Sequence, residues 1–445
     1  MILVKIKKLL IKGLYGSVLY NVDFNEDITF LYGLNGCGKT TVLNITENII
    51  TGNLFYLFDY DFDMIELSYY DNQKEDSIII KKKDNLLDII FNKKQYSLQK
   101  IDKEIFSDSS NAAFKIERRY FEDNEVLREI KTTFNYLYLP LNRSTKNHMK
   151  YEEYRMYGES PYYRRKFGYD LRNVPENKID NSLIDVEILI MDSMRKINSK
   201  LSSINDQFRN DILKSSLGVA DFSLSDFKYY ITNYNIKKIN KIAQDYKRLL
   251  QNLNIISKEE QAKYDAFFSR IIKLSNEEYN TEKNDIAELI FNYRELIRIE
   301  RFTKIASATE KEKEKLLSKP KLFVETINKF IRDSSGDKEI IINEEGNIKF
   351  IANNTSKPIS VHYLSSGERQ LLIFFANLIF NVDNSKNGIF VVDEPELSLH
   401  LYWQRIFVEE ARKINPNIQM IFATHSPEFI SKYRTKMFRL EKKYQ

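Results

Sequence analysis

The segment from Gly33 to Thr41, GLNGCGKTT, restricts the possible folds of this chain more than any other stretch. It follows an apolar run at residues 28–31 and precedes a segment of helical character at residues 42–50. A glycine-rich turn between a strand and a helix directs successive backbone N–H groups toward one point, where a phosphate group can bind. The spacing GxxxxGK[ST] in this context therefore predicts a P-loop, and with it an α/β nucleotide-binding domain.

The glycine and polar positions of this turn have separate predicted tasks. Gly33, Gly36 and Gly38 let the backbone curl so that its N–H groups face the phosphates. Lys39 places a cation at the β and γ phosphates, and the Thr40 hydroxyl can ligate Mg²⁺. The predicted cofactors are ATP and Mg²⁺, and the predicted cofactor-binding residues of this segment are Gly33, Asn35, Gly36, Gly38, Lys39, Thr40 and Thr41.

Two acidic residues, Asp393 and Glu394, stand directly after the apolar run at residues 389–392. A buried parallel strand presents the residues at its carboxyl end to the ligand crevice of an α/β sheet. Asp393 is predicted to hold Mg²⁺, directly or through water, and Glu394 to orient or deprotonate the attacking water. His425 follows the next apolar run, residues 419–423, and is predicted to hydrogen-bond the γ-phosphate.

A serine–glycine turn, residues 365–368, precedes the apolar run at residues 371–375. Small residues at a helix start leave backbone N–H groups and the helix dipole directed at an anion. An ordinary capped helix begins with the same residue types, but the three other nucleotide-type motifs favour an anion site. The turn is therefore predicted to form the second half of an ATP site, with Ser365, Ser366, Gly367 and Glu368.

The remaining chain divides into strand-like and helical parts. MIELSYY, SIIIKKK and AFKIERRYF, between residues 63 and 121, predict an antiparallel sheet, and residues 338–352 predict a hairpin that turns at Glu345-Gly346. An apolar strand at 136–139 leads to Asn142 and Arg143, which either sense the γ-phosphate or simply leave the strand. The basic tail after Ser426 is interpreted as a solvated helix end.

Residues 181 to about 335 carry apolar side chains at helical spacing. The pattern sustains no long heptad seam, so we expect a compact helical arm rather than an extended coiled coil. The charge run at residues 310–315 is interpreted as a solvated helix end, with a further helix after Pro320. The predicted domains are 1–142, 143–335 and 336–445.

Composition sets few limits on partners. The chain has 68 Lys and Arg against 63 Asp and Glu, and the resulting net charge of +5 does not by itself indicate nucleic acid. Residues 151–172 interleave Tyr with Arg, which suits nucleic acid, a protein interface or a loop over the site equally. The only cysteine, Cys37, excludes a disulfide framework. No apolar run approaches the roughly 18 residues needed to cross a bilayer, so we expect a soluble cytoplasmic protein.

Taken together, these motifs resemble those of the ABC-type ATPase heads of the SMC, RecF and OLD class. GLNGCGKTT is similar to the Walker A motif, LSSGE (364–368) to the signature motif, FVVDEPE (390–396) to Walker B, and ATHSP (423–427) to the switch histidine. EPELSLHLYWQ is similar to stand-alone ATPases of anti-phage systems of the Septu and PARIS types, and to the ATPase half of OLD nucleases. An OLD nuclease continues into a TOPRIM domain, whereas this sequence stops about twenty residues after His425. The resemblance covers residues 1–142 and 336–445.

The resemblance implies an α/β fold: a P-loop NTPase head of ABC type, with a mixed sheet, an antiparallel β subdomain and a large helical insertion. It implies that Glu394 and His425 are catalytic, and that Ser366 and Gly367 act on the nucleotide of a second subunit, in a homodimer or higher homo-oligomer. ATP-dependent dimerisation would then control a separate effector, expected to be a nuclease. The alternative is a RecF- or SMC-like DNA-maintenance ATPase that binds DNA directly, and a transporter ATPase is a weaker third.

Overall fold

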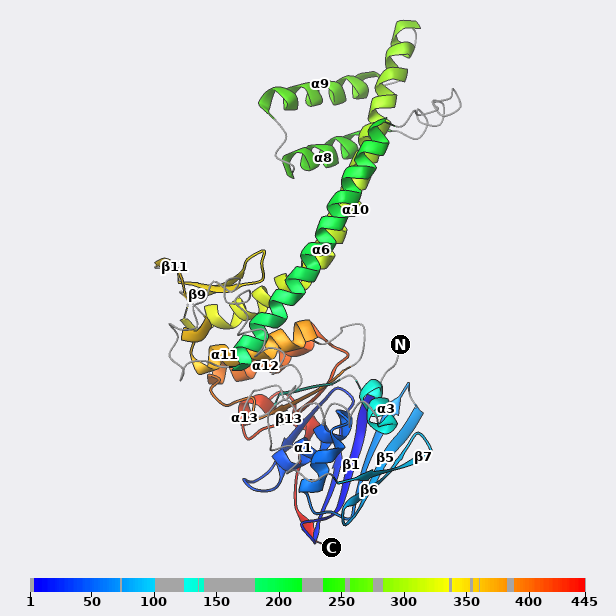
Figure 1. Ribbon diagram of the computed structural model, residues 1–445. Coiled ribbons are helices and arrows are strands. Elements are labelled where there is room, and N and C mark those ends of the chain that lie inside the picture. Colours follow the sequence, from blue (N-terminus) through cyan, green and yellow to red (C-terminus); the bar gives the residue numbers. More distant parts are fainter. Residues whose placement is uncertain are drawn as a thin grey trace, which may run out of the picture. The chain divides into compact units, whose positions relative to one another are not determined.

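The computed structural model describes residues 4–72, 74–100, 124–134, 136–139, 181–217, 235–252, 257–274, 283–335, 338–352, 355–359, 361–381 and 388–444 (Figure 1). The chain forms two units, Met1–Met194 with Lys319–Gln445, and Arg195–Ser318. Both boundaries lie inside helices, α6 (Asn181–Leu217) and α10 (Lys283–Ser335), which continue from one unit into the other. The second unit is therefore shorter at both ends than the predicted domain 143–335. Asn142, Arg143 and residues 151–172 lie outside the described residues.

A five-stranded sheet, in the order β14-β3-β13-β12-β8, contains the strands that carry the nucleotide motifs. Its strands are β3 (Ile28–Tyr32), β8 (Tyr136–Leu139), β12 (Ile389–Asp393), β13 (Gln419–Ala423) and β14 (Met437–Arg439), and its helices are α1 (Lys39–Ile50), α11 (Ser366–Ala376) and α12 (Leu401–Ile414). All neighbouring strands are parallel. The two central strands are buried at every residue, as expected of parallel strands covered on both faces.

Alternate residues of these strands face two different layers. Ile389 and Val391 of β12 pack with α1 in a core that also contains the antiparallel sheet. Phe390, between them, meets Phe374 of α11, with ring centroids 4.8 Å apart. Because successive side chains of a strand point to opposite faces, α1 and α11 lie on opposite faces of the sheet. Figure 1 shows the same arrangement, with α12 beside α11.

A seven-stranded antiparallel sheet, in the order β15-β2-β1-β4-β5-β6-β7, packs on the other side of α1. Its strands are β1 (Val4–Leu14), β2 (Val18–Asp23), β4 (Met64–Asp71), β5 (Lys74–Lys83), β6 (Leu86–Phe91), β7 (Lys94–Gln99) and β15 (Lys443–Tyr444). The predicted antiparallel sheet is confirmed in β4 and β5. We did not predict β6 and β7, because charged and amide residues interrupt their apolar pattern. The expected strand AFKIERRYF lies outside the described residues.

One buried side chain joins the two sheets. Gln419, at the start of β13, accepts a hydrogen bond from the Ile6 N–H at 2.7 Å and donates to the Ile6 carbonyl at 2.7 Å. It also donates to the Asn25 carbonyl at 2.8 Å. The amide thus completes the backbone hydrogen bonds of one β1 residue, which lies 413 positions away in the chain.

A three-stranded sheet, β9 (Lys338–Ile342), β10 (Ile348–Ala352) and β11 (Thr355–Ile359), packs beside the end of α10. The predicted hairpin at Glu345-Gly346 is confirmed, and Gly346 has a φ of 91°. Asn328 of α10 donates to the Ile340 carbonyl at 3.1 Å and accepts from the Ile340 N–H at 2.7 Å. The Trp403 indole of α12 donates to the Phe330 carbonyl at 2.9 Å. The C-terminal part of α10 is therefore fixed to both β9 and α12.

The second unit contains α8 (Ile236–Asn252) and α9 (Lys258–Leu274) beside parts of α6 and α10. Figure 1 draws α6 and α10 along one another, and partly buried residues recur on both at heptad spacing. They are Ile197, Leu201, Ile204 and Phe208 on α6, and Phe302, Ala306, Thr309, Lys313 and Leu316 on α10. The expected compact helical arm contains helices of 37 and 53 residues, and polar Thr309 and Lys313 interrupt the apolar repeat among the partly buried positions of α10. The predicted helix end at 310–315 was wrong, since α10 continues through this run and through Pro320.

The C-terminal tail adds one strand to each large sheet. β14 pairs in parallel with β3, and β15 pairs with β2. The interpretation of this tail as a solvated helix end was wrong, because strands of three and two residues are too short to show an alternating pattern. Within the ranges described above, no helix is both long and apolar enough to cross a membrane.

Candidate nucleotide-binding site

The turn between β3 and α1 has the backbone conformation of a phosphate cradle. Gly36 and Gly38 have φ values of 75° and 99°, a region that strains residues with a side chain. A Cβ atom on Gly38 would lie 2.2 Å from the Tyr20 hydroxyl. That hydroxyl donates to the Cys37 carbonyl at 2.6 Å, and burial raises the pKa of Tyr20 to about 12. Tyr20, which we did not predict, therefore supports the turn from the antiparallel sheet as a hydrogen-bond donor.

Lys39 lies folded over its own loop. The side chain is 6% exposed, and its Nζ donates to the carbonyls of Gly33 at 3.1 Å and Leu34 at 3.5 Å. In the described part of the chain no carboxylate forms an ion pair with it. Thr40 and Asn35 are exposed, and Thr41 is partly buried. The ammonium group is therefore available to a phosphate, because it would exchange only carbonyl contacts for it.

Asp393 ends β12 beside this cradle and is buried, with 4% of its surface exposed. Burial raises the pKa of its carboxyl group, and the charges of Glu394 and Glu396 raise it further, while Thr40 and Lys39 lower it. Among the described residues, neither carboxylate oxygen has a hydrogen-bond partner with good geometry. Two orphaned carboxylate oxygens close to the Thr40 hydroxyl fit a hard divalent cation, which prefers oxygen ligands. Thr40 and Asp393 thus lie close enough to interact, and their binding of Mg²⁺ stays a prediction.

Glu394 has a left-handed backbone conformation, with a φ of 45°. Its N–H donates to the Ala423 carbonyl of the neighbouring strand at 2.8 Å. Such a conformation costs of order 1–3 kcal/mol for a residue with a side chain and persists only where the surroundings impose it. Strain of this kind concentrates at functional sites, so the observation supports a specific orientation of this carboxylate at the strand end.

His425 follows β13, the strand next to β12, so both predicted catalytic residues lie at the same edge of the sheet. Its backbone N–H donates to Glu396 Oε1 at 2.6 Å, and its side chain is exposed. Glu396 therefore connects the loop after β12 to the loop after β13. Glu396 is not among the predicted site residues, although its spacing from Glu394 indicates a further acid at this edge.

Gln404, on α12, links the same two loops through its side-chain amide. Its Nε2 donates to the Leu399 carbonyl at 2.8 Å and to the Glu396 carbonyl at 3.4 Å. Its Oε1 accepts from the Ser426 hydroxyl at 2.6 Å. The residue is 7% exposed, so these bonds are shielded from water. No local pattern marks Gln404, because its partners lie on two separate loops.

The serine–glycine turn begins α11 as predicted, and its side chains satisfy one another. The Ser365 hydroxyl accepts from the Glu368 N–H at 3.3 Å, while Glu368 Oε2 accepts from the Ser365 N–H at 2.8 Å. Lys338 pairs with Glu368 Oε1 at 3.3 Å. Glu368 is 6% exposed, so its carboxylate stabilises the helix start, and direct contact with nucleotide stays a prediction. Ser365 and Ser366 are exposed.

The serine–glycine turn packs on the loop after β12. A Cβ atom on Gly367 would lie 2.4 Å from the Ser398 carbonyl, so only glycine allows this approach. Gln370 of α11 donates to the Pro395 carbonyl at 2.8 Å. The loop from Glu394 to Ser398 therefore meets the catalytic edge at one end and the serine–glycine turn at the other.

The family described as "AAA domain, putative AbiEii toxin, Type IV TA system" matches residues 28–431, nearly the whole chain. The chain belongs to this family. The "Retron Vc95 probable ATPase" of Vibrio cholerae serotype O1 biovar El Tor is 28% identical over 138 residues, covering 29% of this chain and 26% of that protein. The "Retron Ec83 probable ATPase" of Escherichia coli is 33% identical over 90 residues, covering 18% of this chain and 17% of that protein. Both matches thus span only about a quarter or less of these relatives' length.

Among solved structures, this chain is similar to two Smc head domains. One, from Pyrococcus furiosus and bound to the C-terminal domain of ScpA, gives a TM-score of 0.39 at 11% identity, covering 100% of this chain and 96% of that chain. The other, from Pyrococcus yayanosii, gives 0.36 at 13% identity, covering 100% and 97%. Both TM-scores lie below 0.5, so the assignment rests on the family match and the observed architecture. The family match and the observed architecture confirm the predicted α/β P-loop head with an antiparallel β subdomain and a large helical insertion.

Proposed function

We propose that this chain hydrolyses Mg²⁺-ATP in a site that a second copy of the chain completes. The resulting ATP-dependent dimer controls a separate effector of a defence system. One observation carries the proposal. The helix of the P-loop, α1, and the helix of the serine–glycine turn, α11, lie on opposite faces of one sheet. The exposed Ser366 begins the helix on the face opposite the cradle at Lys39, which supports a site that a second chain completes.

The residues of one chain then have distinct roles. Lys39 would leave the carbonyls of its loop to bind phosphate oxygens, and Thr40 and Asp393 would hold Mg²⁺. A cation held there would supply positive charge next to the transferred phosphoryl group. Glu394, fixed by its strained backbone, orients and deprotonates the attacking water. His425 donates to the γ-phosphate, in a loop that Glu396 and Gln404 hold in place.

Exposed apolar side chains flank the serine–glycine turn and the loop after β12. Tyr363, Leu397, Leu401 and Tyr402 are 56%, 40%, 56% and 42% exposed. Burying such surface against a second copy is favourable by about 25 cal/mol for each Å² of apolar area. Their position around Ser366 supports closure of this face over the nucleotide of a partner.

Mixing two inactive variants tests the composite site. Lys39→Ala should weaken nucleotide binding, and Ser366→Arg should spare binding but block closure, because the two residues would serve opposite nucleotides. In a mixed dimer, one of the two sites contains only wild-type residues. ATPase activity should therefore return in the mixture. If mixing restores no activity and a cysteine at position 366 forms no crosslink to the partner's P-loop, the composite site is wrong.

The effector is proposed to be a separate nuclease. Septu- and PARIS-like motifs support a defence role, as do the retron ATPases by name. Hydrolysis of a phosphodiester by metal needs ligands grouped around an open cation site, and in the part of the chain that is described no group of three or more His, Cys, Asp or Glu could hold a metal. The pure ATPase, incubated with plasmid, linear DNA and RNA in Mg²⁺ or Mn²⁺, should cut none of them. Cleavage that persists in Glu394→Gln would contradict this separation of roles.

A further inference from the structure

The exposed face of α8 carries cations and amides and no acid. Between positions 237 and 251, every exposed residue is of one of these two types. They are Lys237, Asn240, Lys241, Gln244, Lys247, Arg248 and Gln251. The single acid in this stretch, Asp245, is partly buried. We call these seven residues the basic face of α8.

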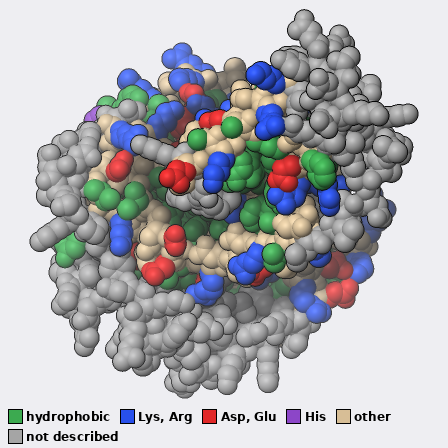
Figure 2. All heavy atoms as spheres, turned by 90° about the horizontal axis from the view of Figure 1, so that it is seen from above, with side chains coloured by type: hydrophobic (Ala, Val, Ile, Leu, Met, Phe, Trp, Pro, Cys, Tyr) green, Lys and Arg blue, Asp and Glu red, His purple; other side chains and the backbone are tan. Residues whose placement is uncertain are grey.

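The cations of the basic face have no ion-pair partner among the described residues. Lys237, Lys241, Lys247 and Arg248 appear in none of the ion pairs of this part of the chain. Other cations of the described residues are paired, for example Arg405 with Glu428 at 2.7 Å. Figure 2 likewise shows Lys and Arg mixed with Asp and Glu over the described surface seen from above. The basic face therefore keeps a local positive charge that the small net charge of the chain does not reveal.

The opposite side of α8 is anchored in a core. Ile239 and Ile242 pack with Phe268 of α9 and with Tyr293 and Leu296 of α10. Lys237 and Arg248 are separated by 11 residues, or about 16 Å along a helix. The cations are thus held along a preformed surface long enough to meet several successive phosphates.

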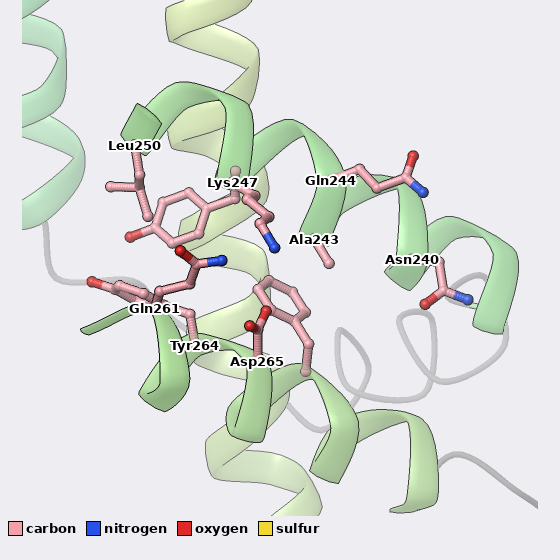
Figure 3. A pocket seen from close by; sticks show the side chains of 10 residues that line it. Asn240, Ala243, Gln244, Lys247, Leu250, Gln261, Tyr264 and Asp265 are labelled. Carbon is pink, nitrogen blue, oxygen red and sulfur yellow. The ribbon is translucent and has the colours of Figure 1, made fainter. Parts of the chain in front are cut away.

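A pocket of about 230 Å³ lies between α8 and α9, next to the basic face (Figure 3). Asn240, Gln244 and Lys247 line it from α8, and Gln261, Tyr264 and Asp265 line it from α9. The rings of Tyr246 and Tyr264 meet edge to face, with centroids 5.2 Å apart. Amide and carboxylate groups can pair with the edge of a nucleobase, and an aromatic face can stack on it.

We propose that the basic face of α8 and this pocket bind single-stranded nucleic acid. Phosphates contact Lys237, Lys241, Lys247 and Arg248, and one base enters the pocket against Tyr264. An acidic protein would use the cations but not the tyrosines and amides beside them, and a duplex would keep its bases stacked inside. The inference is independent of the ATP site, since every residue named belongs to the second unit.

Fluorescence anisotropy with the full chain and labelled single strands of DNA and RNA, without nucleotide, tests the proposal. Lys241→Ala with Arg248→Ala should weaken binding by about tenfold or more, and should lower the slope of log K against log salt by about 1.4. Lys311→Ala with Lys315→Ala removes two exposed cations of the alternating run on α10 and is the matched control. It should stay within about twofold of the wild type. Both double variants should keep wild-type ATPase rates and melting temperature, because neither touches the ATP site.

Two substitutions of Tyr264 test the contact with a base separately from the contribution of charge. Tyr264→Ala should weaken binding of a single strand by about fivefold or more, whereas Tyr264→Phe keeps the aromatic face and should bind normally. Three results would overturn the proposal. The first is an equal loss of binding in the α8 double variant and in the α10 control double variant. The others are duplex DNA bound as tightly as single strands, and displacement of the strand by polyglutamate at equal charge. The last result would assign an acidic protein to this surface.

Discussion

The two halves of the nucleotide site are built in opposite ways, although each begins a helix beside the same sheet. At the P-loop, Lys39 rests on carbonyls of its own turn, and Asp393 buries two oxygens without good hydrogen bonds from described residues. At the serine–glycine turn, Ser365 and Glu368 satisfy each other, and Lys338 neutralises the carboxylate. The first half contains charges that a bound ligand would neutralise, whereas the polar groups of the second half are already paired with one another. Ligand binding should therefore change the first half much more than the second.

The largest expected effect is that of Glu394→Gln. The amide keeps the size of the side chain but cannot accept a proton, and loss of a general base costs about 10²- to 10⁴-fold in rate. ATP binding should be unchanged, so equilibrium binding of ATP and steady-state turnover should be measured on the same preparation. Turnover within twofold of the wild type would remove Glu394 from the catalytic role and leave its backbone strain unexplained.

Gln404→Met should have a smaller effect on turnover. Methionine conserves the volume but loses the hydrogen bonds to Leu399 and Ser426 that hold the two catalytic loops together. We expect kcat to fall by about tenfold with KM within about twofold, since a small misplacement acts on the chemical step. Ser426→Ala, which keeps the Leu399 bond, is the control and should lose less. Equal KM and kcat losses in both variants would indicate general loosening instead.

Asp393→Asn should stabilise the protein without nucleotide while abolishing Mg²⁺-dependent hydrolysis. Because burial raises the pKa of Asp393 in the folded state, the group favours folding below the pKa of the unfolded chain and loses that contribution as the pH rises through the folded pKa. Removing the charge should therefore add about 1 kcal/mol at neutral pH. Thermal melting of both proteins should show a gain at pH 7 that disappears near pH 4. A lower melting temperature at neutral pH would mean that the carboxylate is already compensated.

Glu368→Gln should destabilise the protein, in contrast to Asp393→Asn. The amide keeps one acceptor for the Ser365 N–H but loses the ion pair with Lys338 and the charge that favours a helix start. We expect a loss of about 0.5–1 kcal/mol in the free energy of unfolding, from chemical denaturation. Lys338→Met tests the ion pair separately and should account for part of this loss. Stabilisation by Glu368→Gln would show that the second half also contains an uncompensated charge.

Local patterns were sufficient to predict the parts of the fold that follow from neighbouring residues. The P-loop turn, β12 with its two acids, β13 and the start of α11 all lie where their motifs indicated. The sequence could not reveal Tyr20, Gln404 or Gln419, because each acts through hydrogen bonds to residues remote in the chain. The partly buried heptad positions of α10 were missed for a different reason, because Thr309 and Lys313 break the apolar repeat there.

The pairing of β3 has a consequence for the order in which the protein folds during its synthesis. β3 carries the P-loop, but its two neighbours, β13 and β14, are synthesised several hundred residues later. Gln419, which completes the hydrogen bonds of Ile6, is made equally late. Contacts of such long separation form slowly, and an unpaired apolar strand is prone to aggregate meanwhile. A nascent chain released before residue 419 should therefore depend on chaperones, and should bind no nucleotide however intact its P-loop sequence is.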